Sequence, residues 1–303
     1  MIATEESIAV MENTHGPVEQ LRAKVRQLWD ELSPAERAVC QFLVSAPPEQ
    51  ILFASAQELG AATGTSNATV VRTMQRLGFG GLPGLKRVLA AEFTSAVAPD
   101  VRLKQRISHV GQDLSGIWER VFDEARERID HCRRLFDAEA FKKAVELLVN
   151  APGVLVFGTG ASDPAARHLA LKLGRRGHRA RATSATGFAL ADDLLALGHG
   201  DVLVIFQPGR RLKEITVLID RAHAVGAGIV LISDELGGEF ADRVDAALAA
   251  PHTPTGITGE PLTGIIVADA LLLALDSLDQ TRSVEHSHQL SALREQLLGP
   301  RFR

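Results

Sequence analysis

Three short stretches in the second half of this chain consist almost entirely of apolar residues. They read VLVFG, VLVIF and GIVLIS, and they begin at Val154, Val202 and Gly228. Segments with helical periodicity stand between them. A strand that is buried on both faces shows no alternation of polar and apolar residues. The pattern therefore predicts a parallel β-sheet that helices cover on both faces.

The length of 303 residues suggests about two domains. Residues 1–17 are acidic and aperiodic, and we expect a disordered tail there. Residues 18–94 show only helical patterns, and residues 95–113, of mixed charge, are predicted to be a linker. Residues 114–303 contain the alternating strands and helices. The expected fold class is α plus α/β, with an all-helical N-terminal domain and a doubly wound C-terminal domain.

Two helices separated by a short turn are predicted between residues 55 and 77. Ser55 begins a capping box that Glu58 completes, and a second helix begins after Ser66. The turn between them contains Gly64. Two helices at this spacing are typical of a DNA-binding helix-turn-helix.

The second of these helices has an apolar side and a polar side. Val70, Val71, Met74 and Leu77 are expected to face the core. Arginine can donate two hydrogen bonds to guanine, asparagine pairs with adenine, and threonine contacts phosphate or a thymine methyl group. An ordinary helical domain also has amphipathic helices, so the pattern alone leaves both interpretations open. The residues predicted to contact DNA are Ser66, Asn67, Thr69, Arg72, Thr73, Arg76 and Lys86.

The composition excludes several classes of protein. A net charge of -4 and a pI near 6.2 exclude a wholly basic nucleic-acid coat, but one DNA-reading surface needs only a few cations. Cys40 and Cys132 cannot form a disulfide framework, which favours the cytoplasm. No apolar run approaches the roughly 18–20 residues that span a bilayer, so no membrane partner is expected. His286 and His288 have no obvious third ligand, and no metal site is predicted.

The N-terminal half resembles a known family over the segments LSPAERAVCQFLV, LFASAQELGAATGTSNATVVR and RLGFGGLPGLK. These are similar to the N-terminal domain of the RpiR/MurR family of bacterial transcriptional regulators. The resemblance implies a small helical DNA-binding domain, followed by a sugar isomerase (SIS) domain that binds phosphosugars. With HRARAT and VDAALAA, the three runs above make five β-rich runs, and this region resembles the SIS fold, which has a five-stranded parallel sheet.

A glycine-rich loop, GTGAS, follows the first apolar run and matches the first loop of SIS domains. Gly158 and Gly160 permit a tight turn, and Ser162 stands at a helix start, where amides and a hydroxyl can hold an anion. A dinucleotide-binding loop needs a third glycine where this chain has Asp163, so no cofactor is predicted. A plain strand–helix connection is the alternative.

The second loop departs from the SIS pattern. SIS domains carry a Ser-x-Ser-Gly-x-Thr phosphate cradle here, whereas this chain reads QPGRRL from Gln207. Two interpretations stay open: Arg210 and Arg211 bind an anion through their guanidinium groups, or the pocket has lost that ligand. The predicted ligand-binding residues are Gly158, Gly160, Ser162, Thr183, Ser184, Gln207, Gly209, Arg210 and Arg211.

We therefore predict a cytoplasmic DNA-binding transcriptional regulator that responds to a small anionic metabolite, a sugar phosphate or sugar derivative. It should bind a double-stranded DNA operator as a homodimer or homotetramer, because twofold assembly doubles the contacts. No enzyme activity and no catalytic residue is predicted, and Glu260 is interpreted as a solvated loop side chain. The alternatives are a SIS-fold sugar-phosphate isomerase and a DNA-binding protein whose SIS domain only oligomerises.

Overall fold

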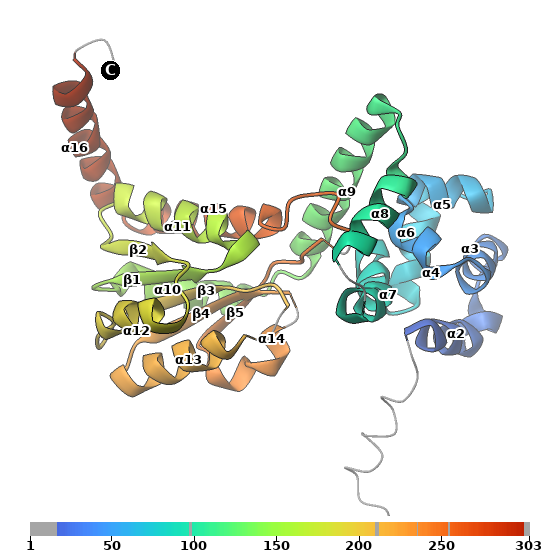
Figure 1. The fold of residues 1–303 in the computed structure, drawn as a ribbon, viewed down its shortest axis with the longest axis horizontal. Helices are drawn as coiled ribbons and strands as arrows, with labels where there is room; N and C mark the ends of the chain where they lie inside the picture. The colour runs from blue at the N-terminus through green and yellow to red at the C-terminus, as the bar shows by residue number, and fades with distance from the viewer. Residues whose placement is uncertain (1–16, 97–98, 210–211, 235, 254, 300–303) are drawn as a thin grey trace, which may run out of the picture. The chain divides into compact units, whose positions relative to one another are not determined.

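The computed structural model describes residues 17–96, 99–209, 212–234, 236–253 and 255–299 (Figure 1). The chain divides into two compact units. The first contains the described residues up to Arg134 together with Thr253–Thr258, and the second contains Leu135–His252 and the described residues from Gly259 onward. The predicted disordered tail falls on residues 1–17, of which all but Pro17 lie outside the described ranges.

The first unit is helical, as the sequence predicts. The predicted capping box of Ser55 and Glu58 forms, and Ser33 and Glu36 form the same motif at the start of an earlier helix. The elements are α2 (Pro17–Leu28), η1 (Trp29–Glu31), α3 (Pro34–Ser45), α4 (Pro48–Phe53), α5 (Ala56–Thr63), α6 (Asn67–Arg76), α7 (Leu82–Ala96), α8 (Pro99–Val110) and α9 (Leu114–Arg134).

The core of the first unit is formed by the apolar sides of these helices. Val70, Met74 and Leu77 are all buried, as predicted for the inner side of α6. They pack with Leu21, Leu43, Leu59 and other apolar side chains in one cluster. This packing holds α6 against α3, α5 and α7 and leaves its other side exposed.

Most of the described part of the interval predicted as a linker is helical. Helix α8 lies within residues 95–113, and α9 belongs to the first unit rather than to the second. The amphipathic pattern of α9 follows the weakly periodic stretch of residues 95–113, and α9 was therefore predicted to belong to the C-terminal domain. The unit boundary at 134/135 therefore lies after the one predicted from composition.

The second unit is a three-layer α/β domain. Its five strands are parallel and in the order β2-β1-β3-β4-β5. The strands are β1 (Val154–Gly158), β2 (Ala180–Thr183), β3 (Val202–Phe206), β4 (Gly228–Ser233) and β5 (Ala246–Ala249). The helices are α10 (Ala138–Asn150), η2 (Gly160–Ser162), α11 (Asp163–Arg175), α12 (Gly187–Leu195), α13 (Lys213–Val225), α14 (Leu236–Glu239), η3 (Ala241–Arg243), α15 (Leu262–Leu278) and α16 (Gln280–Leu298).

Alternate residues of each central strand enter two different cores. Val156 and Val204 pack with α10, α11 and α15 on one face, whereas Phe157 and Ile205 pack with α12 and α13 on the other. Within this unit, Figure 1 shows α11 and α15 on one side of the sheet and α12 and α13 on the other. Both faces are covered, and this confirms the predicted doubly wound sheet.

The strand order reverses beside β1. The chain leaves β1 toward α11 on one face, and it leaves the neighbouring β3 toward α13 on the other face. In open α/β sheets the ligand crevice lies outside the carboxyl ends of the strands at such a switch point. The loops that follow β1 and β3 are therefore the place to examine for a ligand.

Candidate functional site

The turn between α5 and α6 depends on glycine. Gly64 has φ +64°, the left-handed conformation that ends α5, and Thr65 N–H donates to Gly60 O across 2.8 Å. Ser66 then caps α6, because its Oγ accepts a hydrogen bond from Thr69 N–H at 3.1 Å. The two helices thus have the short-turn arrangement of a helix-turn-helix.

The outer side of α6 carries the side chains that can reach a DNA groove. Asn67, Arg72, Gln75 and Arg76 are exposed, and Thr69 is half-buried. Gln75 was missed by the sequence reasoning, although its amide is a known partner of adenine. Helical spacing counted from Arg72 is the signal that would have included it.

The two arginines of α6 differ in their contacts. Arg76 Nη2 donates to Glu31 O at 2.8 Å, and Arg76 Nη1 donates to Glu36 Oε2 at 3.3 Å. The backbone N–H of Ser33, together with Arg76, holds the pKa of Glu36 below its ordinary value. Arg72 bonds only the carbonyl oxygen of Ala68 among the described residues. Its guanidinium is therefore the better placed of the two to bind a base.

Two residues predicted to contact DNA are buried in the described structure, Thr73 and Lys86. Thr73 is fully buried, and its hydroxyl donates to Thr69 O at 2.8 Å. Lys86 is 3% exposed, and its Nζ lies 3.7 Å from Glu127 Oε2. Burial removes both side chains from any surface that a DNA backbone can contact.

The candidate ligand pocket of the second unit lies where the switch point predicts it. It is a small cavity of about 20 Å³ at the carboxyl ends of β1, β3, β4 and β5. Ser162 and Gln207, both predicted, line it. The other lining residues are Ala165, Phe206, Pro208, Ile232, Ala250, Glu260, Pro261, Thr263 and Gly264. Glu260, interpreted from the sequence as a solvated loop residue, is exposed and is also part of this wall.

The glycine-rich loop GTGAS forms as expected, and its residues have different structural roles. A Cβ on Gly158 would lie 2.8 Å from Ser162 O and 2.9 Å from Ala166 Cβ, so glycine permits α11 to approach the strand. Gly160 has φ +58° and open space around it. Ser162 is 8% exposed and reaches the pocket. Of the three, Ser162 is therefore the residue that a ligand can contact through a side chain.

The predicted residues after β2 do not line the pocket. Thr183 Oγ1 donates to Asp193 of α12 and accepts from Ala185 N–H. The bond from Thr183 holds the pKa of Asp193 below its ordinary value, with a further contribution from Arg181. Thr183 and Ser184 are absent from the lining of the cavity. The hydroxyl of Thr183 instead stabilises the packing of α12.

The altered second loop is described only in part. Gln207 is buried and its N–H donates to Ile232 O at 3.1 Å, which fixes the backbone at the pocket wall. Gly209 follows but does not line the cavity. Arg210 and Arg211 lie outside the described residues, so their predicted role in anion binding stays a prediction.

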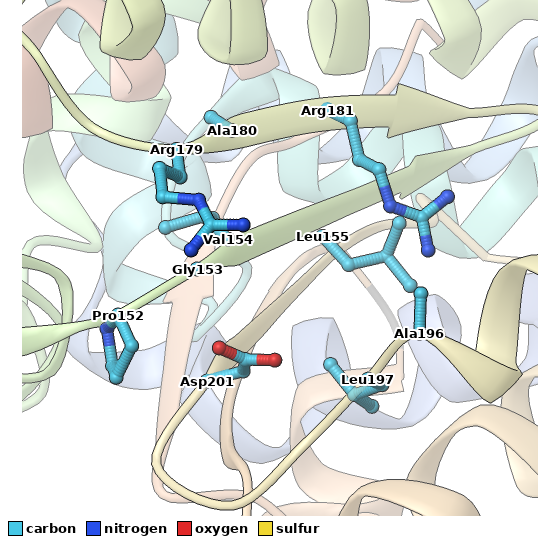
Figure 2. A pocket seen from close by; sticks show the side chains of 10 residues that line it. All are labelled: Pro152, Gly153, Val154, Leu155, Arg179, Ala180, Arg181, Ala196, Leu197 and Asp201. Carbon is cyan, nitrogen blue, oxygen red and sulfur yellow. The ribbon is translucent and has the colours of Figure 1, made fainter.

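A larger groove of about 420 Å³ lies at the opposite end of the strands. Residues 152–155 and 179–181 line it, which places it at the amino ends of β1 and β2. Figure 2 shows Leu155 and Leu197 within it, with Arg179 and Asp201 at its edge. Ligands of open α/β sheets bind at the carboxyl ends, so this groove is not the predicted ligand site.

Within the described ranges, no three His, Cys, Asp or Glu side chains gather closely enough to hold a metal ion. His286 and His288 both lie on α16, where His286 Nδ1 bonds Arg282 O. Searching the same ranges finds no helix long and apolar enough to cross a membrane.

Comparison with known families identifies both units. The profile described as "Helix-turn-helix domain, rpiR family" matches residues 19–96, and that described as "SIS domain" matches residues 147–274. Together the two matches span more than half of the chain. This chain belongs to the RpiR family. The RpiR-type match covers α5 and α6, and the SIS match covers all five strands.

Curated relatives of this RpiR-family chain have two architectures. The HTH-type transcriptional regulator HexR of Pseudomonas aeruginosa is 26% identical over 94% of this chain and 98% of its own length. The bifunctional protein glk of Burkholderia thailandensis is 27% identical over 241 residues, which is 79% of this chain. This chain spans 36% of the length of that relative.

Solved structures share the fold of this RpiR-family chain. The sugar isomerase domain of an RpiR transcription factor from Sphaerobacter thermophilus has a TM-score of 0.55 at 23% identity, and it covers 60% of this chain and 99% of its own. The Vibrio vulnificus NanR protein complexed with ManNAc-6P has a TM-score of 0.53 at 19% identity. That match covers 93% of this chain and 99% of the NanR chain. At these identities the likeness establishes the fold alone.

Proposed function

We propose that this chain is a DNA-binding transcriptional regulator that responds to a small anionic metabolite, a sugar phosphate or sugar derivative. The observation that carries the proposal is helix α6, which follows a short glycine turn and exposes Asn67, Arg72 and Gln75 beside a buried apolar side. These are the side chains that read guanine and adenine in a major groove. The full-length similarity to HexR supports the same function.

The described pocket supports a sensor better than an enzyme. The three hydroxyl residues of the Ser/Thr-rich cradle are replaced by Gln207, Gly209 and Leu212. A sugar-phosphate isomerase needs a phosphate anchor to hold its substrate beside a general base. The isomerase alternative rests on Glu260, which is one of the residues that line the pocket. An assay of aldose–ketose interconversion with sugar phosphates tests it, because measurable turnover would favour the enzyme.

We further propose that the protein acts as a homodimer or homotetramer on a near-palindromic operator. Leu114, Trp118 and Phe122 of α9 are exposed at helical spacing, and the rings of Trp118 and Phe122 lie 4.9 Å apart. Large exposed apolar side chains grouped in this way favour self-association. Multi-angle light scattering on the full chain tests the proposal, since a monomeric mass would contradict it. Such a regulator would act in the cytoplasm, where its operator is.

The experiment that tests the regulatory function is selection of binding sites from genomic DNA by the purified full-length protein. The proposal expects enrichment of a short, near-palindromic sequence. The genes beside the selected sites would then name the pathway and the class of effector. Recovery of fragments without a shared sequence would contradict the proposal.

A further inference from the structure

Three threonine hydroxyls converge on one buried carboxylate in the first unit. Thr253 Oγ1 and Thr258 Oγ1 each donate to Glu124 Oε1 across 2.7 Å, and Thr255 Oγ1 donates to Glu124 Oε2. Glu124 lies on α9 and is 7% exposed. A buried carboxylate is tolerated only when hydrogen bonds satisfy it, so Glu124 favours one conformation of this segment.

Two arginines and an isoleucine add to this attachment. Arg128 Nη1 donates to Thr258 Oγ1 at 2.7 Å, and Arg106 Nε donates to Thr255 O at 3.0 Å. Ile257 packs against an apolar cluster that contains Leu52 and Phe53. Side chains from α8, α9 and α4 thus bind Thr253, Thr255, Ile257 and Thr258 as part of the first unit.

The carboxylate is held in its charged form. Burial raises the pKa of Glu124, but the hydrogen bonds from its threonine partners and the positive charge of Lys86 hold the pKa below its ordinary value overall. The segment is therefore bound through charge-assisted hydrogen bonds, which are stronger than neutral ones.

The chain on either side of this segment belongs to the second unit and lines its pocket. Ala250 precedes the segment, and Glu260, Pro261 and Thr263 follow it. Thr263 Oγ1 donates to Pro251 O at 2.7 Å, so the two flanks are bonded to each other.

The attachment to the second unit begins without a spacer. His252 Nδ1 lies 2.6 Å from Asp234 Oδ2, at the end of β4. One peptide bond therefore separates a residue bonded within the second unit from Thr253, which is bonded to Glu124.

The pocket is too small for a metabolite in the described state. Its volume of about 20 Å³ is of the order that one water molecule occupies. Small-molecule sites in proteins typically enclose about 300–1,000 Å³. A sugar phosphate bound there would displace part of the wall, to which Ala250, Glu260, Pro261, Thr263 and Gly264 belong.

Helix α9 contacts α5 about one turn to either side of Glu124. Glu127 Oε1 accepts a hydrogen bond from Ala56 N–H at 3.1 Å, at the start of α5. Arg120 Nη2 lies 2.6 Å from Glu58 Oε1, also on α5. A shift of α9 at Glu124 would thus change the support of the helix that packs against α6.

We propose that Glu124 couples the ligand pocket to the DNA-reading helices through residues 253–258. The inference rests on the proposed function, since it names how a ligand would regulate DNA binding. A ligand that moves the pocket wall shifts the flanks of the segment. Glu124 then transfers the shift to α9 and, through Glu127 and Arg120, to α5. Such coupling is a difference in free energy between two arrangements, and it is reciprocal.

Hydrogen–deuterium exchange of the full-length protein tests the coupling without a known ligand. Thr263→Val removes a hydrogen bond wholly within the second unit and mimics movement of the pocket wall. We expect it to raise amide exchange at least twofold in the α9 peptide around Glu124. In the double variant with Glu124→Gln that extra effect on α9 should disappear. Glu119→Gln is the matched control, because Glu119 is an exposed carboxylate of the same helix.

Thr258→Val is a second way to weaken the bonding between Glu124 and the threonine segment. It removes the hydroxyl that donates to Glu124 and keeps a β-branched side chain. It should block the transfer as Glu124→Gln does. The proposal would be overturned if Thr263→Val changed amide exchange only within the second unit. It would also be overturned if Thr263→Val raised exchange in α9 equally with and without Glu124→Gln. Failure of the proposed function would look different: normal transfer to α9 in a protein that binds no DNA selectively.

Discussion

Lys86 Nζ lies 3.7 Å from Glu127 Oε2, and only 4% of the Lys86 side chain is exposed. The same glutamate accepts a hydrogen bond from Ala56 N–H at the start of α5. A cation that the sequence assigned to the DNA backbone is therefore an internal partner of α9. It stabilises the position of the helix-turn-helix rather than binding phosphate.

Lys86→Met is expected to destabilise the first unit by about 3 kcal/mol, because the loss of one partner leaves the other charge uncompensated in a buried site. Both tryptophans, Trp29 and Trp118, lie in this unit, so denaturant unfolding followed by tryptophan fluorescence measures the loss. The dependence of DNA affinity on salt should not change. A salt slope that falls by about one would instead show that Lys86 contacts a phosphate.

Thr73→Val tests the other buried residue of the predicted DNA-binding set. The hydroxyl of Thr73 donates to Thr69 O inside the first unit, so its removal should cost about 1 kcal/mol of stability. DNA affinity, measured by fluorescence anisotropy, should stay within about twofold of the original. A tenfold loss of affinity in a folded variant would place Thr73 in the DNA interface after all.

His178 should make the second unit sensitive to acid. Burial, and then the charge of Arg282, lower the pKa of His178 from 6.5 to about 4. Between these values the unfolded chain binds a proton that the folded unit does not, so stability falls as pH drops from 6.5 to 4. The free energy of unfolding of the second unit is lower by about 3 kcal/mol below pH 4 than above pH 6.5.

Calorimetry of His178→Gln across this pH range checks that expectation. The variant should lose the part of the pH dependence that His178 supplies, whereas His223→Gln, at an exposed position, should keep it. An unchanged pH profile in His178→Gln would contradict the account.

Arg210 and Arg211 provide a test of the anion pocket. A thermal-shift screen of sugar phosphates, sugar acids and amino sugars would first find a ligand that stabilises the protein. Isothermal titration should then show at least tenfold weaker binding to the Arg210→Ala/Arg211→Ala variant, because guanidinium groups bind phosphate and carboxylate through paired hydrogen bonds. Arg175→Ala, an exposed position on α11, is the control. Equal affinity in the original protein, the double variant and the control would show that Arg210 and Arg211 do not bind the ligand.

Local patterns were enough to predict most elements of both units, with α8 as an exception. The capping boxes at Ser33 and Ser55 and the glycine turn at Gly64 depend on neighbours in sequence, and all three form. The runs around Val156 and Val204 predicted doubly covered strands because burial on both faces leaves no polar positions.

Contacts between distant segments were beyond such patterns. Lys86 and Glu127 are separated by 41 positions, and nothing near Lys86 in the sequence shows that α9 would cover it. Thr73 lies at the border of the polar side of α6, and the packing of α3, α5 and α7 around that helix widens its buried side. The threonine segment bonded to Glu124 is likewise about 130 residues away from it.

The most direct test of the central claim is an anisotropy titration of full-length protein with a duplex from the binding-site selection and with a scrambled duplex of equal length. The account predicts at least about 1,000-fold tighter binding to the selected duplex at physiological salt. Arg72→Ala should remove about 1–3 kcal/mol of that affinity and relax one base preference, while Arg133→Ala, an exposed arginine of α9, should not. Equal affinity for both duplexes would contradict the account.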